Sequence, residues 1–411
     1  MRKICIVLLD GLGDRAYPAL GGQTSNEAAR TPVLDAVCRD GSCGLLWPLG
    51  RGRAPASELA HWAMLGMLPA EFPGRAVLEA RGHGVPVRPD RVYGYAAVRT
   101  FERAGASYAV TGRDRAPRLP LDHPFQRSVV VEGLEFTPHA TVGGEAVIEV
   151  AGPCADDRVT DTDPFFRDRD PLLEPLPCHP GASAMAVAVG AWTRATMHAG
   201  RVVTTKWWGR PRSLASVGER HGLTGVLVAG SAFLAGLAET VGMTPVRVPD
   251  TGDAAADLGA RLAAAAEALA GDADLAWVHT KALDEAGHTK DPLHRVATLE
   301  ALDPVLAALH GPPFSAAIVC VTGDHATPCV PEMIHSGDPV PFVLSGLGVR
   351  ADRATAFGEL GCAEGILGHL VGSDVMPLLL NAADRALFAG SRPSAVRAPA
   401  GHPRVRPLEV V

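Results

Sequence analysis

The sequence predicts an α/β protein with a doubly wound, mostly parallel sheet and an inserted α+β cap domain. Short apolar runs bounded by Gly, Asp or Pro recur along the chain, which is typical of parallel strands buried on both faces. Helical stretches lie between several of these runs. A central segment has a different pattern, and 411 residues suffice for one large domain and a smaller one.

The elements of the main sheet follow from these patterns. The predicted strands are 4–9, 202–205, 226–228, 275–279, 317–322 and 341–344. The predicted helices, which are rich in Ala and Leu or carry apolar residues at helical spacing, are 184–198, 254–270 and 293–309. The central segment instead has alternating runs at 128–131 and 146–150 among many Arg and Asp residues. We therefore expect a core domain of residues 1–84 and 181–390, a cap of residues 85–180, and an extended Pro/Arg-rich tail over 391–411.

Composition limits the function classes. Hydrophobic residues make up 47% and charged residues 20%, as in a packed globular protein. The net charge of −7, from 38 Lys and Arg against 45 Asp and Glu, argues against a nucleic-acid partner. The eight cysteines form no CxxC pair, which favours buried free thiols in a reducing compartment. The first apolar run is too short for a signal peptide, and no run is long enough to span a membrane. We predict a cytoplasmic protein with no membrane partner.

Polar side chains follow the predicted strands at their carboxyl ends, where open parallel sheets bind ligands. These residues are Asp10 after 4–9, Lys206 after 202–205, Asp284 and His288 after 275–279, and Asp324 and His325 after 317–322. Taken alone, each of these residues also has an ordinary structural explanation. Asp10-Gly is also a turn former, Asp284 and His288 could be a surface pair, and His335 could be a solvated loop residue. Together they predict a metal site. Carboxylate and imidazole ligands without thiolate suit Mn or Zn better than Ca or Mg, and their number suits two ions that clamp a phosphoryl group.

Several of these segments resemble the motifs of one family. The run from His279 to His288, HTKALDEAGH, resembles the HxKATDEAGH signature of archaeal-type, cofactor-independent phosphoglycerate mutases, a branch of the alkaline phosphatase superfamily. The other matching segments are 10–15, 31–35, 55–61, 74–75, 159–164, 322–328 and 335–341. The resemblance extends over about residues 3–390 and implies an alkaline-phosphatase-like core.

The resemblance implies roles for individual residues. One divalent ion would be held by Asp284, His288 and His335. The other would be held by Asp10, Ser57, Asp324 and His325. Mn is the first expectation, with Zn, Co or Mg as alternatives, and no 2,3-bisphosphoglycerate is required. Ser57 would be the nucleophile and would form a phosphoserine intermediate, while His61 is expected to be an ordinary helix residue one turn further on. A small phosphorylated metabolite would be bound by Arg75, Arg115, Arg118, Asp161 and Lys206.

The sequence departs from the family pattern among the expected substrate residues. Ala96 and Ala235 stand where the family has Arg and Lys, and Trp207 and Trp208 stand where it has small residues. The tryptophans could pack the cap or form a platform for a flatter substrate. Phosphoglycerate mutase activity therefore has two alternatives. One is a phosphatase, phosphomutase or phosphotransferase acting on another small phosphorylated or phosphonylated metabolite, and the other is a non-catalytic binding protein on the same fold. The oligomeric state stays open.

Overall fold

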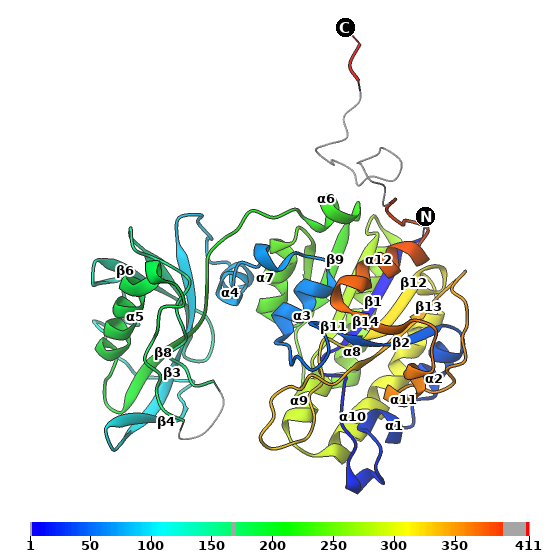
Figure 1. Ribbon diagram of the computed structural model, residues 1–411, viewed down its shortest axis with the longest axis horizontal. Coiled ribbons are helices and arrows are strands. Elements are labelled where there is room, and N and C mark those ends of the chain that lie inside the picture. The colour runs from blue at the N-terminus through cyan, green and yellow to red at the C-terminus, as the bar shows by residue number, and fades with distance from the viewer. Residues whose placement is uncertain (1, 166–169, 389–407, 411) are drawn as a thin grey trace. The chain divides into compact units, whose positions relative to one another are not determined.

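A computed structural model of the chain describes residues 2–165, 170–388 and 408–410 (Figure 1). The chain divides into two compact units. Unit 1 comprises Met1–Glu71 and Leu214–Val411, and unit 2 comprises Phe72–Ser213. This insertion is longer at both ends than the expected cap of residues 85–180. Most of the expected tail from residue 391 lies outside the described residues.

In the described part of unit 1, the strands form one eight-stranded sheet. Its order is β10 (Thr244–Arg247), β9 (Gly225–Ala229), β11 (Leu275–Thr280), β1 (Ile4–Leu9), β12 (Ile318–Thr322), β13 (Val340–Ser345), β2 (Ser42–Trp47) and β14 (Gly368–Val371). Neighbouring strands are parallel except that β13 runs antiparallel to both β12 and β2. The predicted doubly wound, mostly parallel sheet is confirmed. The expectation that 341–344 is a parallel strand is wrong.

Helices cover both faces of this sheet. On one face α2 (Pro32–Arg39), α8 (Ala254–Ala270), α10 (Pro292–Leu302) and the 3-10 helix η4 (Asp303–His310) share a hydrophobic cluster with Cys5, Val7 and Leu9 of β1. Ile4, Ile6 and Leu8 alternate with these residues and are equally buried, so they face the other side. There α12 (Gly372–Ala382) contacts β12 and α3 (Ser57–Met64), and α7 (Ala232–Thr240) contacts β9 and β10. Burial on both faces explains why β1 is a continuous apolar run.

The remaining elements of unit 1 are short. They are η1 (Pro18–Leu20), α1 (Ser25–Ala28), η2 (Pro69–Glu71), α6 (Val217–His221), α9 (Ala282–His288), η5 (Phe314–Ala316) and α11 (Glu359–Ala363). None of the helices in the described part of the chain has the length and apolar character that a membrane crossing requires. All eight cysteines are free; six are buried as predicted, whereas Cys154 and Cys178 are exposed.

Unit 2 is built on a second, antiparallel sheet, which has six strands among the described residues. They are β3 (Val92–Ala104), β4 (Ser107–Arg113), β5 (Val129–Val131), β6 (Leu134–Ala140), β7 (Glu145–Ala151) and β8 (Arg201–Gly209), in the order β4-β3-β7-β6-β5 with β8 also paired to β3. Helix α4 (Arg75–Gly82) packs on one face, and η3 (Pro180–Ala182) with α5 (Ser183–Ala195) packs on the other.

The placement of β8 corrects the prediction that 202–205 is a strand of the main sheet. Residues 204, 205 and 206 pair antiparallel with residues 97, 96 and 95 of β3. Helix α5 then buries Met185, Val189 and Trp192 in the core of unit 2, and the Trp192 ring stacks on Phe136 at 5.5 Å. Because α4, α5 and β8 bury their apolar sides on this sheet, residues 72–84 and 181–213 belong with the insertion rather than with the core.

Candidate metal centre

Three adjacent parallel strands bring the polar segments of unit 1 to one edge of the sheet. Strand β1 lies between β11 and β12, with Leu9 aligned to Thr280 and Leu8 aligned to Thr322. The strands therefore end at the same level. The segments that follow them, which begin at residues 10, 281 and 323, leave the sheet side by side.

The first group consists of Asp284, His288 and His335. Asp284 and His288 lie one turn apart on α9, and His288 Nε2 is 3.2 Å from Asp284 Oδ1. His335 Nε2 is 3.6 Å from the same oxygen. Its other ring nitrogen, Nδ1, lies 2.8 Å from the carbonyl oxygen of Pro55, which turns Nε2 toward Asp284. The sequence-predicted residues of this group are thus brought together.

The second group consists of Asp10, Ser57, Asp324 and His325. His325 Nε2 lies 3.0 Å from Ser57 Oγ, 3.2 Å from Asp10 Oδ1 and 3.4 Å from Asp324 Oδ2. Ser57 is the first residue of α3, and the amide of Gly11 donates to Asp324 Oδ1 at 3.1 Å. The two groups adjoin, because the rings of His325 and His335 stack with centroids 3.6 Å apart.

Burial and mutual charge shift the pKa values of this cluster in opposite directions. Burial, together with the charge of Asp10, raises the pKa of Asp324 to about 8. Burial also acts to raise the pKa of Asp10, but the hydrogen bond from His279 and the close approach and charge of His325 outweigh it and hold that pKa well below its usual range. Burial acts to lower the pKa of His325, yet the charges of Asp324 and Asp10 raise it to about 9. The buried carboxylates of Asp10 and Asp324 are therefore stable as neighbouring anions only when positive charge lies beside them.

The centre fits a divalent cation on a further observation. Asp10 Oδ1 and Asp324 Oδ2 are buried, and among the described residues the approach of His325 Nε2, at 3.2 and 3.4 Å, does not complete a hydrogen bond to either oxygen. Buried polar atoms are normally satisfied, and carboxylates without a partner are costly. The donor atoms are oxygen and imidazole nitrogen, which suit Mn or Zn. The third carboxylate, Asp284, is also buried beside His325 and His335.

Three residues that were not predicted as site residues from the sequence also lie against the centre. His279 Nε2 lies 3.0 Å from Asp10 Oδ2. Thr327 Oγ1 donates to Asp284 Oδ1 at 2.8 Å. His61, expected to be an ordinary helix residue, is fully buried with Nε2 3.7 Å from Asp324 Oδ2. All three lie inside the family-like segments, and the four-residue spacing of His61 from Ser57 places both on one side of α3.

The residues expected to bind substrate lie in unit 2, and only some of them cluster there. The Nζ atom of Lys206 is 3.9 Å from the ring centroid of Trp207, and the Arg75 guanidinium lies 3.9 Å from a Trp207 ring centroid. Asp161 Oδ1 accepts a hydrogen bond of 2.9 Å from the Trp207 amide. Arg115 and Arg118, in contrast, are exposed on the segment after β4.

The positions that depart from the family pattern also differ in whether they lie beside Lys206 and Arg75. Trp208 is buried and lies against Gly94, where any added Cβ would meet its ring at 2.6 Å, so Trp208 packs the unit. Ala96 is buried in the same hydrophobic cluster, and Tyr95 faces the opposite side of β3 toward Trp207. Ala235 is buried on α7 in unit 1. Of the two tryptophans, only Trp207 is half-buried, and it lies against the positively charged side chains of Arg75 and Lys206.

Comparison with known proteins decides the family. The model of the metalloenzyme superfamily matches residues 2–382. A 2,3-bisphosphoglycerate-independent phosphoglycerate mutase of Methanoculleus marisnigri is 33% identical over 405 residues, which covers 92% of this chain and 97% of its own length. The chain belongs to this mutase family. A second member, from Methanopyrus kandleri, is 33% identical over 413 residues, covering 93% of this chain and 97% of its own length.

Solved structures agree with this assignment. The cofactor-independent phosphoglycerate mutase of Thermoplasma acidophilum has a TM-score of 0.63 at 25% identity, covering 93% of this chain and 100% of its own. A protein of Pyrococcus horikoshii has a TM-score of 0.75 at 24% identity, covering 95% of this chain and 99% of its own, and shares the fold. The family membership and the fold class expected from the motifs are therefore confirmed.

Proposed function

We propose that this chain transfers a phosphoryl group through Ser57 with two divalent cations and interconverts 2- and 3-phosphoglycerate. The observation that carries the proposal is the position of Ser57 Oγ, 3.0 Å from His325 Nε2, beside the buried carboxylates Asp10 and Asp324. A serine hydroxyl is a weak nucleophile unless a base or a metal activates it. The mutases that the chain resembles act on phosphoglycerate without 2,3-bisphosphoglycerate, as their names state.

The proposed ligand sets follow the two groups. Asp284, His288 and His335 would hold one cation, and Asp10, Ser57, Asp324 and His325 would hold the other. We infer Mn²⁺ as the first choice, since the donors are carboxylate, hydroxyl and imidazole. When bound, such cations lower the pKa of a coordinated hydroxyl and neutralise charge on a transferring phosphoryl group.

The residues of the chain then carry the transfer. Ser57 Oγ loses its proton and attacks the phosphorus as the bond between phosphorus and the substrate oxygen breaks. The substrate oxygen takes up one proton in exchange and leaves as the free glycerate hydroxyl. The phosphoryl group stays on Ser57, at the first residue of α3, where helix N-terminal amides favour an anion. Reorientation of the glycerate presents its other hydroxyl. That oxygen takes the phosphoryl group, and Ser57 is regenerated.

Unit 2 would supply substrate recognition in this proposal. Arg75 and Lys206 flank the half-buried Trp207 ring, and both positively charged side chains are suited to binding a carboxylate or phosphate. Asp161 would act indirectly by holding the Trp207 backbone. Arg115 and Arg118 are exposed, and they stay among the proposed substrate-binding residues.

A second candidate function rests on the same cluster. The half-buried Trp207 ring, which packs on the buried Tyr95 ring with centroids 5.6 Å apart, offers an aromatic surface beside Arg75 and Lys206. Such a surface suits a small phosphorylated or phosphonylated metabolite that is flatter than phosphoglycerate. The chain would then be a phosphatase, phosphomutase or phosphotransferase that uses the same Ser57 chemistry.

The experiment that tests the proposal uses full-length protein loaded with Mn²⁺ and supplied with 3-phosphoglycerate, followed by phosphorus NMR. We expect 2-phosphoglycerate, with a phosphorylated protein detectable by intact mass. The matched variant Ser57→Ala should give neither, because it removes the nucleophile at little structural cost. Free phosphate in place of 2-phosphoglycerate, or turnover only with another phosphorylated compound, would favour the second candidate. Normal turnover by Ser57→Ala would overturn both.

A further inference from the structure

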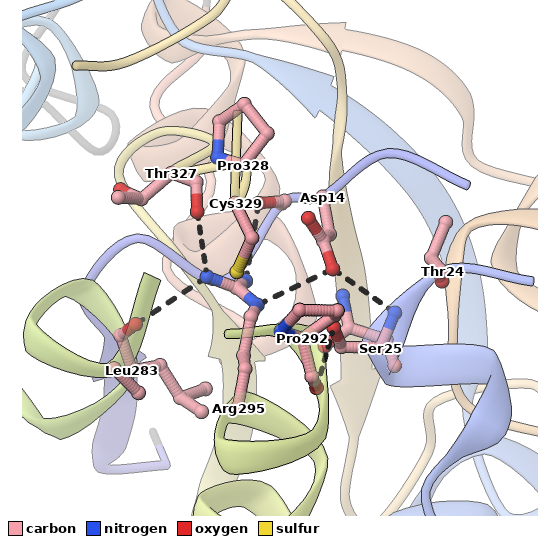
Figure 2. Close-up of polar contacts among 12 residues, drawn as sticks. Asp14, Thr24, Ser25, Leu283, Pro292, Arg295, Thr327, Pro328 and Cys329 are labelled. Carbon is pink, nitrogen blue, oxygen red and sulfur yellow. Dashed lines mark hydrogen bonds and ion pairs between the residues drawn. The ribbon is translucent and has the colours of Figure 1, made fainter. Parts of the chain in front are cut away.

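Arg295 of α10 is fully buried and bonds to the backbone of several surrounding segments (Figure 2). Its Nη2 atom donates to the carbonyl oxygens of Gly11 at 2.7 Å, Leu12 at 2.6 Å and Gly13 at 3.1 Å. Its Nη1 atom donates to the carbonyl oxygens of Leu283 at 3.3 Å and Thr327 at 3.0 Å. One planar guanidinium thus joins three stretches of chain that are far apart in sequence.

The bonded carbonyls belong to the segments that carry the proposed ligands. Gly11 follows Asp10, and Leu283 precedes Asp284. Thr327 lies two residues after His325, and its own side chain donates to Asp284 at 2.8 Å. The position of Arg295 is therefore coupled to the backbone next to carboxylates of both proposed ligand sets.

A carboxylate on one of the same segments balances the buried charge. Arg295 Nε lies 3.4 Å from Asp14 Oδ2, and both side chains are fully buried. Asp14 in turn accepts from the Ser25 amide at 3.0 Å (Figure 2). It also accepts from the Tyr17 hydroxyl at 2.5 Å. The Tyr17 hydroxyl accepts from the Cys329 amide at 2.6 Å, which ties the segment after β12 to the segment after β1 a second time.

These contacts matter because each of the three segments holds a carboxylate close to those of the other two. Asp10, Asp284 and Asp324 are buried within one cluster, and they repel when no cation lies between them. A ligand set binds a cation tightly only if its members are held in place before the cation arrives. Hydrogen bonds to backbone carbonyls provide this restraint without using any ligand atom.

We propose that Arg295 is a positioning residue that holds the segments after β1, β11 and β12 in the arrangement that binds divalent cations. This inference rests on the proposed metal-dependent function. Among the described residues, Arg295 has hydrogen bonds to backbone carbonyls and an ion pair with Asp14 but none with a proposed ligand side chain, so it acts through the backbone beside the ligands. Its removal should weaken cation binding more than the loss of a buried arginine elsewhere in unit 1.

The chain offers a matched control in Arg261 of α8. Arg261 is also buried, with 1% of its side chain exposed, and it pairs with Asp250 and donates to the Val248 carbonyl at 3.2 Å. Val248 and Asp250 lie after β10, and neither is on a proposed ligand segment. Arg261→Met therefore reports the general cost of removing a buried arginine from this unit.

The experiment compares full-length wild type with Arg295→Met, Arg295→Lys and Arg261→Met. Mn²⁺ affinity is measured by titration calorimetry at a temperature where circular dichroism shows every protein folded. We expect Arg295→Met to bind Mn²⁺ about 10- to 100-fold more weakly, as for loss of an outer-shell partner. Arg295→Lys should recover part of the affinity because its ammonium can still donate to several carbonyls. Arg261→Met should bind within about twofold of wild type.

A second readout does not depend on the cation. Amide hydrogen exchange of chelator-treated protein should be faster in Arg295→Met at residues 11–14, 281–284 and 325–329 but not in Arg261→Met. Wild-type Mn²⁺ affinity in a folded Arg295→Met protein would overturn the proposal, as would exchange that rises evenly across unit 1. If wild type binds no Mn²⁺, the proposed function fails, and the exchange pattern alone decides the positioning role. Should Arg295→Met not fold, Arg295→Lys against Arg261→Lys carries the same comparison.

Discussion

At the scale of single residues, the centre depends on groups that orient the proposed ligands. His279 lies on β11 with its Nε2 3.0 Å from Asp10 Oδ2, while His325 approaches the other oxygen of the same carboxylate at 3.2 Å. A carboxylate with one oxygen held by an outer imidazole keeps the other oxygen aimed at a cation. Positioning contacts of this kind are as much part of the site as the ligands themselves.

The first prediction follows from that contact. His279→Ala should weaken Mn²⁺ binding about 10- to 100-fold, because Asp10 loses its outer hydrogen-bond partner. Titration calorimetry measures the affinity. The control is His294→Ala, which changes an exposed histidine on α10 and should leave affinity unchanged. Equal affinities for the two variants would show that His279 does not orient Asp10.

The second prediction concerns Lys206 in unit 2. Burial lowers the pKa of Lys206 from 10.5 to about 8, and the charge of Asp163 offsets only part of this effect. Between these two pKa values the unfolded chain holds the proton more tightly than the folded protein, so folding becomes more favourable as pH rises through that window. Below pH 8 the buried charge has its full cost.

Lys206→Met lacks this titration. At pH 7 the variant should be more stable than wild type by about 1–3 kcal/mol, and its advantage should shrink as pH rises toward 10. Urea unfolding at pH 7.0 and 9.5, followed by a signal from unit 2, measures the difference. Arg103→Met, at an exposed position of β3 in the same unit, is the control. A stability difference that stays constant with pH would contradict the assigned pKa.

At the scale of elements, helix α5 and the antiparallel sheet of unit 2 stabilise each other through one aromatic pair. Trp192 on α5 is fully buried, and its ring stacks on Phe136 of β6 with centroids 5.5 Å apart and an interplanar angle of 11°. The third prediction is that Trp192→Ala costs about 3–5 kcal/mol of stability, because it removes a large buried ring and leaves a cavity. Denaturant unfolding measures this cost.

The control for that prediction lies on the same helix. Val187 has 60% of its surface exposed, so Val187→Ala should change stability by less than about 0.5 kcal/mol. If both variants lost the same stability, core packing would not account for the effect, and the assigned role of the aromatic pair would be wrong.

At the scale of the whole molecule, cation binding should contribute to the stability of unit 1, which contains every proposed metal ligand. The fourth prediction is that a chelator lowers the melting temperature of the full-length protein and that Mn²⁺ restores it. A ligand at 100 times its dissociation constant adds about 2.7 kcal/mol to the folded state. Calorimetric melting at several Mn²⁺ concentrations measures the shift.

Asp284→Asn provides the matched test, because Asn keeps the volume of the side chain and removes its charge. The variant should melt at a temperature that depends less on Mn²⁺ than wild type does. A melting temperature that is independent of both chelator and Mn²⁺ in wild type would remove the basis for a resident cation.

The sequence by itself determined the elements of the main sheet and the residues at their ends. The run 4–9 is apolar throughout because β1 is covered on both faces, and the helix over 254–270 is set by its Ala and Leu pattern and by the N-cap Asp253. The proposed ligands could be named because each follows a strand directly or lies in a family-like segment. These properties are local, so a linear pattern records them.

Only the tertiary structure decided which sheet an element joins and which side chains meet. Residues 202–205 are a β-strand in either sheet, but the partner β3 is more than a hundred residues away, and pairing with it moved β8 and α5 into unit 2. The orientation of β13 and the burial of Trp208 against Gly94 are decided in the same way. His61, His279 and Arg295 gain their places at the centre from contacts across 260 residues or more, such as His279 with Asp10 and Arg295 with Gly11. Local propensity and periodicity carry no information about such distant partners, because the free energy that selects them comes from packing and hydrogen bonding between segments that meet only in the folded chain.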